Sequence, residues 1–341
     1  DQEIQVHLGE LSKVIFPFVR QIVETKEEST RSDEKISLNF ISFNIMSRVM
    51  YSTKNNFVNA HGLIPRYQGD QITDEENNQR LSKVKEIIGN NKADIVFLQE
   101  ANQGWPGDVM DFEGYQLVSD KSLFGLKCNY QYAFKRGKKN HSQRDATQIF
   151  YNPERFNLIN SDSGCFGRIE MRRTDKYLLD RFESGDEPTG TGYSFGLVED
   201  KQSGERIFLV NIHVKILDWS AENYPIDKVG REFVQHFGLF IGEVGALEPT
   251  DKLLIAGDFN ADDRIYHGHT DYKSYDELNQ RKWREFMSYV FSKFEKVFGK
   301  IIEVEKGLVS SVHCKGDKGN QDDHIFINES FDTDIISHNN R

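Results

Sequence analysis

The sequence predicts a layered α+β sandwich in which apolar strands are covered by amphipathic helices. Large apolar residues occupy both faces of several short strands, as expected for central strands that are covered on each side. These strands span residues 36–45, 94–99, 206–214 and 252–257. The strands also lack the even βαβ rhythm of a doubly wound fold. We therefore expect stacked layers rather than one parallel sheet.

Helices with one apolar face are predicted between or after these strands. Their apolar residues recur three and four positions apart, which is the spacing of one helix face. We interpret these stripes as core rather than as cofactor-binding surfaces. The residues concerned are Leu81, Val84 and Ile88, then Val229, Phe233, Phe237 and Ile241, then Trp283, Met287, Val290, Phe294 and Val297.

The first 35 residues are predicted to lie outside the main domain, which then spans residues 36–341. Residues 1–23 have apolar residues at helical spacing and are predicted to form an amphipathic helix, kinked near Pro17. The charged run at residues 26–35 has no large apolar side chain and is interpreted as a linker.

The composition is typical of a globular protein. The 341 residues include 43 Lys and Arg against 54 Asp and Glu, and the net charge of −11 repels nucleic acid at long range. A polyanionic partner would therefore have to bind at a local surface. No apolar run is long enough to span a bilayer, and the first residues do not resemble a signal peptide. The cysteines, Cys128, Cys165 and Cys314, form no disulfide or zinc motif. We expect a soluble, cytoplasmic protein; the sequence indicates no oligomeric state.

Polar residues lie at the ends of these apolar strands, where a hydrophobic core has no use for them. Carboxylates and amides are costly to bury unless they bind something, and a hard cation prefers such oxygen ligands. Each residue alone could be a strand cap or a turn residue, but the ordered set favours a magnesium site. In chain order the residues are Asn44, Glu100, Asn211, His213, Asp258, Asn260 and Asp323.

The same residues carry a resemblance to a known family. The segments FNI (43–45), LQE (98–100), NIHV (211–214), GDFN (257–260) and DHIFI (323–327) resemble successive motifs of the endonuclease/exonuclease/phosphatase superfamily. Arg80 also matches an Arg that many members carry. The resemblance spans residues 36 to about 330 and implies a four-layered α/β sandwich, with two mixed sheets face to face between helices. It also implies a metal-dependent phosphoesterase.

The resemblance implies roles in binding metal and phosphate. Glu100 would be the principal ligand of Mg²⁺, or of Mn²⁺ in its place, with Asn44 beside it. His213 and Asn211 would hydrogen-bond the phosphate and its transition-state charge, and Asn260 would hold the phosphate.

The resemblance also implies which residues act on water and close the site. Asp258 would orient or deprotonate the attacking water. The family closes with an Asp–His pair, and DHIFIN is either that pair, which makes Asp323 and His324 catalytic, or the strand before it. We favour the second interpretation because HIFIN is too aliphatic for a closing segment. Asp323 would then line the metal side of the pocket, and the closing motif would lie beyond Arg341 or be lost.

Residues 121–144 are the sequence feature that indicates a substrate. The stretch holds seven Lys or Arg, including Lys135 and Arg136, and no acidic residue, with aromatic residues between them. This pattern is typical of a loop that binds phosphates while its rings stack on bases, although a solvated basic hairpin is equally consistent with it.

We therefore expect a Mg²⁺-dependent phosphodiesterase that acts on a nucleic acid or a nucleotide. The alternatives are a phospholipid or phosphoinositide phosphoesterase and a catalytically impaired binding module of the same fold. Inositol-phosphatase relatives usually carry Tyr-Arg after the GDxN motif, where this chain has Ala261 and Asp262.

Overall fold

Two mixed β-sheets form the centre of the fold. The computed structural model describes residues 19–25, 36–45, 74–101, 111–118, 147–169, 189–214, 226–244, 247, 251–259, 277–304 and 323–331. The first sheet has the order β1-β2-β3-β5-β4, with β1 (Val19–Thr25), β2 (Ile36–Asn44), β3 (Ile95–Gln99), β5 (Gln148–Tyr151) and β4 (Gln116–Leu117). The second has the order β10-β11-β9-β8-β7-β6, with β10 (Ile301–Glu303), β11 (Asp323–Asn328), β9 (Lys252–Asp258), β8 (Arg206–His213), β7 (Thr189–Asp200) and β6 (Phe156–Ile169).

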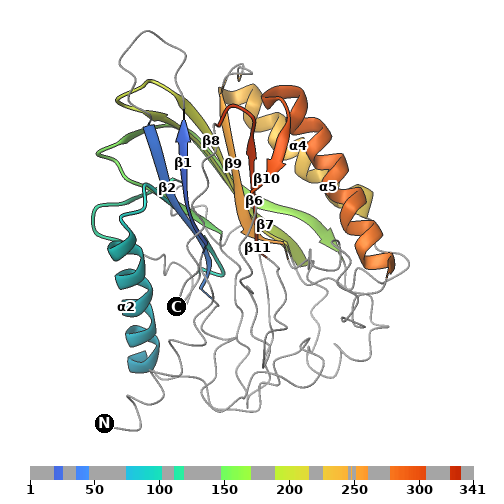
Figure 1. Cartoon of the computed structure of the whole chain (residues 1–341). Helices are drawn as coiled ribbons and strands as arrows, with labels where there is room; N and C mark the ends of the chain where they lie inside the picture. The colour runs from blue at the N-terminus through green and yellow to red at the C-terminus, as the bar shows by residue number, and fades with distance from the viewer. Residues whose placement is uncertain are drawn as a thin grey trace, which may run out of the picture.

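The sheets pack face to face, and helices cover their outer faces (Figure 1). The helix α2 (Asp74–Asn91) lies against the first sheet, and the helices α4 (Ile226–Val244) and α5 (Glu277–Phe298) lie against the second. This arrangement confirms the predicted two-sheet α+β sandwich.

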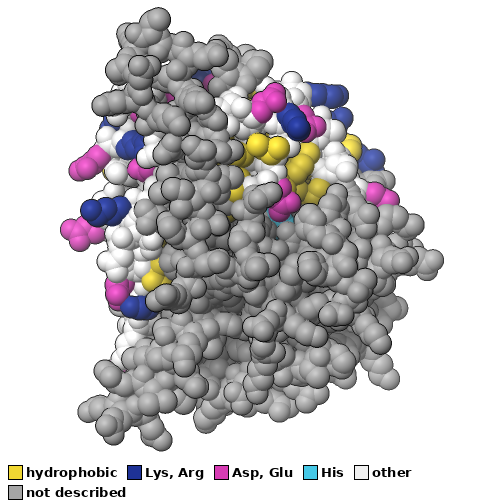
Figure 2. Space-filling view, viewed as in Figure 1, with side chains coloured by type: hydrophobic (Ala, Val, Ile, Leu, Met, Phe, Trp, Pro, Cys, Tyr) yellow, Lys and Arg dark blue, Asp and Glu magenta, His cyan; other side chains and the backbone are white. Residues whose placement is uncertain are grey.

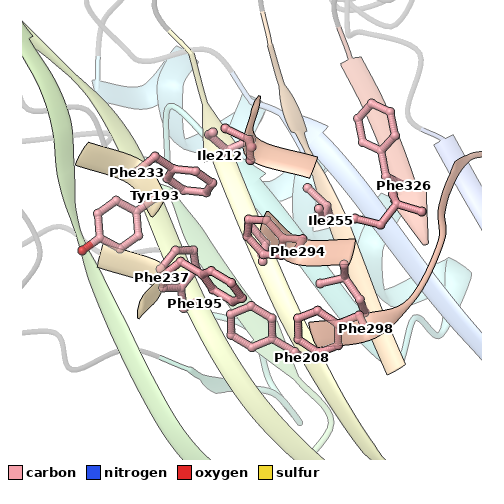
Figure 3. Packing of buried hydrophobic residues seen from close by; sticks show 14 of the residues in the cluster. Tyr193, Phe195, Phe208, Ile212, Phe233, Phe237, Ile255, Phe294, Phe298 and Phe326 are labelled. Carbon is pink, nitrogen blue, oxygen red and sulfur yellow. The ribbon is translucent and has the colours of Figure 1, made fainter. Parts of the chain in front are cut away.

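Three apolar clusters hold these layers together. The cluster between the sheets includes Phe40, Phe97 and Leu254, and a second joins α2 to the first sheet. The third packs α4 and α5 onto the second sheet through aromatic rings (Figure 3). In it Phe237 and Phe294 stack with their ring centroids 4.0 Å apart. The predicted helix stripes are confirmed as core where the structure describes their side chains.

The N-terminal helix prediction, made for residues 1–23, is wrong for residues 19–23. They belong to β1, which pairs antiparallel with β2 from Val19 opposite Ser42 to Thr25 opposite Ile36. Pairing with a neighbouring strand outweighs the helical spacing of a few apolar residues, because that spacing carries no information about tertiary partners. Residues 1–18 and 26–35 lie outside the described residues. The predicted domain boundary at residue 36 stays a prediction. The strand β1, on its N-terminal side, pairs with β2, on its C-terminal side.

The described surface is mostly polar. Figure 2 shows one face, on which a small hydrophobic group lies among charged side chains. The large hydrophobic side chains exposed by more than a third in the described part are Ile159, Leu239 and Ile302, and each belongs to a different element. Within the ranges that the structure describes, no helix has both the length and the apolar character needed to cross a membrane.

Strand direction determines where polar strand ends meet. The strands β2 and β3 run parallel, with Asn44 opposite Gln99, and β8 and β9 run parallel, with His213 opposite Asp258. Because parallel strands end at the same edge of a sheet, each pair brings its terminal polar residues together.

Candidate active site

Four predicted site residues meet where the two sheets face each other. The Asn44 amide Nδ2 donates to Glu100 Oε1 at 3.3 Å and to Asp258 Oδ2 at 2.7 Å. His213 Nε2 lies 3.9 Å from both of these carboxylate oxygens. Asn44 and Glu100 come from the first sheet, and His213 and Asp258 come from the second. The cluster is therefore assembled only when the sheets pack.

Glu100 has a backbone conformation that a side chain rarely adopts. Its φ is 50°, in the left-handed region, and it directly follows the last residue of β3. A residue other than glycine in this region costs of order 1–3 kcal/mol, and such strain concentrates at functional sites. The turn directs the Glu100 carboxylate toward Asn44 and His213 instead of continuing the strand.

Two contacts hold Asn44 at the end of β2. The Ile45 amide donates to Gln99 O at 3.1 Å, and the buried Arg80 side chain of α2 donates through Nη1 to Ile45 O. Arg80, which matched the family pattern in the sequence, thus lies behind the site and fixes its backbone.

Gly257 allows Asp258 to lie beside His213. A Cβ atom at Gly257 would lie 2.0 Å from Ile212 O, a separation that no side chain can accept. Only glycine therefore lets β9 approach β8 this closely, which explains the glycine of the GDFN motif in physical terms.

Asn211 does not reach the cluster, so the phosphate-binding role predicted for it is not supported. Its side chain is fully buried, and Nδ2 donates to Leu98 O at 2.9 Å and to Gln148 O at 2.8 Å. Its oxygen accepts from Gln99 Nε2 at 2.8 Å. Both amide hydrogens are thus used within the core, where a phosphate has no access.

His324 also lies away from the cluster. Asp323 opens β11 and pairs with Asp258, while His324 pairs with Gly257. Because neighbouring strand residues face opposite sides of a sheet, His324 is on the helix side, away from Asp258. There its buried ring lies against Phe259, and Nδ1 lies 2.7 Å from Glu303 Oε1. This placement argues against a catalytic His324 and agrees with the interpretation of DHIFIN as the strand before a closing motif.

Other predicted site residues lie outside the described residues. They are Asn260, Lys135 and Arg136, together with the rest of the basic stretch 121–144, and the Asp323 side chain. Their roles stay predictions.

Sequence reasoning missed a buried polar layer under the cluster. Gln99 Nε2 donates to Ser42 Oγ at 3.3 Å and to Asn211 Oδ1 at 2.8 Å. Each lies one or two positions before a site residue. The signal was present as a polar residue inside each apolar strand, but its partners in other strands could not be read from the sequence.

The oxygen ligands in the cluster fit Mg²⁺. This ion takes one or two carboxylates and keeps several waters, so Glu100 suffices as the carboxylate ligand, and Asp258 adds a second negative charge close by. The Asn44 amide can present its oxygen to an ion if its plane turns over, since the assignment of amide N and O follows from the surrounding hydrogen bonds. Across the described ranges no three His, Cys, Asp or Glu side chains form a group that could hold a metal. Magnesium, with its retained waters, does not require such a group.

Comparison with known proteins places the chain in a family. It matches the model of the endonuclease/exonuclease/phosphatase family over residues 41–334, so the chain belongs to this family, and the resemblance predicted from the motifs is confirmed. It is therefore a hydrolase of the phosphoesterase type, a class that generally depends on divalent metal ions. No curated protein sequence matches the chain.

Several solved structures share similarity with the chain at 15% identity and a TM-score of 0.45. The human Nocturnin catalytic domain with bound sulfate anion aligns with 86% of this chain and 83% of its own. A family protein from Bacteroides thetaiotaomicron aligns with 86% and 84%, respectively. ANGEL2, a 2′,3′-cyclic phosphatase, aligns with 93% and 86%.

Proposed function

We propose that this hydrolase is a Mg²⁺-dependent phosphodiesterase that cleaves a phosphodiester bond in a nucleic acid or a nucleotide. The observation that carries the proposal is the cluster at the junction of the two sheets. Two carboxylates, an amide and an imidazole converge there from four strands, with both carboxylates on one Asn44 nitrogen. Two partly buried negative charges in contact with one amide favour a divalent cation between them.

Glu100 and Asn44 would hold the ion, which when bound supplies Lewis-acid stabilisation of a phosphoryl oxygen. His213 lies between the two carboxylates, where its Nε2–H can donate to a second phosphoryl oxygen as negative charge develops in the transition state. Asp258, beside His213, would orient the attacking water and take its proton. The attack would be in line with the leaving oxygen, whose bond to phosphorus breaks as the bond from the water oxygen forms, and the released alkoxide would take a proton from solvent.

The substrate class is argued from the basic stretch 121–144. Its seven Lys or Arg, with no acidic residue, stand out in a chain of net charge −11. A polyanion repelled by the rest of the molecule can bind to such a local patch, and interleaved aromatic rings can stack on bases. These features favour a nucleic acid or a nucleotide over a phospholipid.

The activity is tested with the wild-type protein and a small diester. We expect release of nitrophenol from bis(p-nitrophenyl) phosphate in Mg²⁺, and loss of that release on adding EDTA. A panel of labelled single-stranded RNA, single-stranded DNA, duplex DNA and phospholipid vesicles then identifies the substrate class. Cleavage of the phospholipid alone would refute the nucleic-acid assignment. Binding of a polynucleotide without cleavage of any substrate would indicate a binding module instead.

A further inference from the structure

Two buried amides join the sheets directly beneath the proposed site. Asn211 of β8 donates to Leu98 O of β3 at 2.9 Å and to Gln148 O of β5 at 2.8 Å. Gln99 of β3 donates back to Asn211 Oδ1 at 2.8 Å and to Ser42 Oγ of β2 at 3.3 Å. We call Gln99 and Asn211 the amide clamp.

The orientation of the clamp is determined by its acceptors. Asn211 Nδ2 faces two backbone carbonyls, so its oxygen must point the other way. That oxygen can only accept, and Gln99 must therefore present Nε2 to it. Neither amide can turn over without losing hydrogen bonds inside the core. The clamp thus defines one position of β8 relative to β3.

The clamp residues lie next to the site residues along the chain. Gln99 directly precedes Glu100, and Asn211 lies two positions before His213 on the same face of β8. Ser42, which holds Gln99, likewise lies two positions before Asn44. The polar layer is therefore one residue layer below the cluster, on the same strands.

This polar layer is expensive in a sandwich whose inter-sheet core is otherwise apolar. Gln99 is fully buried, and its Oε1 has no hydrogen-bond partner in the described part of the chain. An unpaired buried acceptor of this kind costs about 1–3 kcal/mol. Apolar packing holds layers together without direction, whereas hydrogen bonds specify geometry. A costly set of directional bonds under a site built from both sheets indicates a role in alignment.

We propose that the amide clamp positions Glu100 relative to His213 and Asp258, and thereby sets the affinity of the site for its divalent cation. The proposal rests on the proposed function. Gln99 is the last residue of β3 and is joined directly to Glu100 in its left-handed turn. Gln99 is also hydrogen-bonded to Asn211, in the sheet that carries His213 and Asp258. Loosening this bond lets the two halves of the site separate while both sheets remain folded.

The test measures binding of Mn²⁺ alone, followed by electron paramagnetic resonance, in the full chain without substrate. The variant Gln99→Leu has nearly the same volume but donates no hydrogen bond. We expect it to unfold cooperatively in EDTA and to bind Mn²⁺ about 10–100-fold more weakly than wild type, the loss typical when a group that orients a metal ligand is removed. If Gln99→Leu does not fold, Ser42→Ala removes only the bond that holds Gln99, and we expect a loss of about 10-fold.

A matched control comes from the same layer. Ser194 lies opposite Asn211 in β7 and also bonds across the sheets, to Thr147 O at 2.6 Å, but lies next to no site residue. We expect Ser194→Ala to lower the midpoint of thermal unfolding and to leave Mn²⁺ affinity unchanged. Equal Mn²⁺ affinity in wild type and the Gln99 variant, or equal losses in the Gln99 and Ser194 variants, would overturn the clamp.

Failure of the proposed function looks different. In that case the wild type binds no Mn²⁺, or Glu100→Gln binds it as tightly as wild type, and the clamp proposal falls with the site. If wild type and Glu100→Gln behave as expected while the Gln99 variant matches wild type, only the clamp is refuted.

Discussion

Replacing Glu100 with Gln tests whether the two carboxylates are held together for a cation. Asn44 Nδ2 lies 3.3 Å from Glu100 Oε1 and 2.7 Å from Asp258 Oδ2. The two oxygens are then at most about 6 Å apart, where like charges repel by about 3 kcal/mol at an effective dielectric constant of about 20. The two side chains are 18% and 11% exposed, so solvent and the Asn44 amide reduce this repulsion to about 1 kcal/mol.

The expected effect on stability therefore changes sign with metal. In EDTA, Glu100→Gln removes the repulsion, and the free energy of unfolding rises by about 1 kcal/mol. In Mg²⁺ at 100 times its dissociation constant, the wild type gains about 2.7 kcal/mol, whereas the variant gains little. Urea unfolding in EDTA and in Mg²⁺ measures both values, and hydrolysis of bis(p-nitrophenyl) phosphate should be lost in the variant.

The control is Glu154→Gln, which removes the same charge from an exposed position. Glu154 lies in the turn after β5, near Asp94 and so at the opposite end of β3 from Glu100. In Mg²⁺, the free energy of unfolding of Glu154→Gln should rise as much as that of wild type. If Mg²⁺ stabilises Glu100→Gln as much as wild type, Glu100 does not hold the ion.

Three further predictions concern the water, the substrate and the pH. Asp258→Asn should lower kcat by about 10²–10⁴-fold, with a smaller loss of Mg²⁺ affinity than Glu100→Gln shows. If Asp258 only bound the metal, the substitution would lower kcat and Mg²⁺ affinity together. Replacing four basic residues with alanine should raise KM for a polynucleotide but not for the small diester, and equal effects on both substrates would make the stretch structural. The four residues are Lys135, Arg136, Lys138 and Lys139. Burial alone would raise the pKa of Asp200, but hydrogen bonds from Arg155 and two backbone amides lower it. The stability that Asp200 contributes should therefore be lost as the pH falls below 3.8 toward its folded-state pKa, and this loss should be smaller in Arg155→Leu by urea unfolding; equal acid sensitivity would contradict the assignment.

The sequence predicted the central strands and the core because burial leaves a local signal. Apolar residues on both faces of residues 36–45 and 252–257 indicated covered strands, and β2 and β9 occupy these positions. The meeting of Asn44 with Glu100, and of His213 with Asp258, follows from the polar ends of parallel strands, which share a sheet edge. The meeting of the two pairs across the sheets was expected only from the resemblance to the family.

Other features depended on partners far along the chain. The strand β1 exists because it pairs with β2, and nothing within residues 19–25 indicates that pairing. The role of Asn211 depends on carbonyls at Leu98 and Gln148, which lie 113 and 63 residues away. The sequence left the role of His324 open, because DHIFIN could be the closing Asp–His pair or the strand before it. The pairing of Asp323 with Asp258 determines the sheet face on which His324 lies, and this face is away from the cluster.

The metal assignment is tested most directly by the anomalous scattering of Mn²⁺ in crystals of the wild-type protein. We expect a difference peak at the junction of the two sheets, within coordination distance of the Glu100 carboxylate and between it and Asp258. A Mn²⁺ peak elsewhere in the molecule, with none beside Glu100 at saturating Mn²⁺, would contradict the assignment.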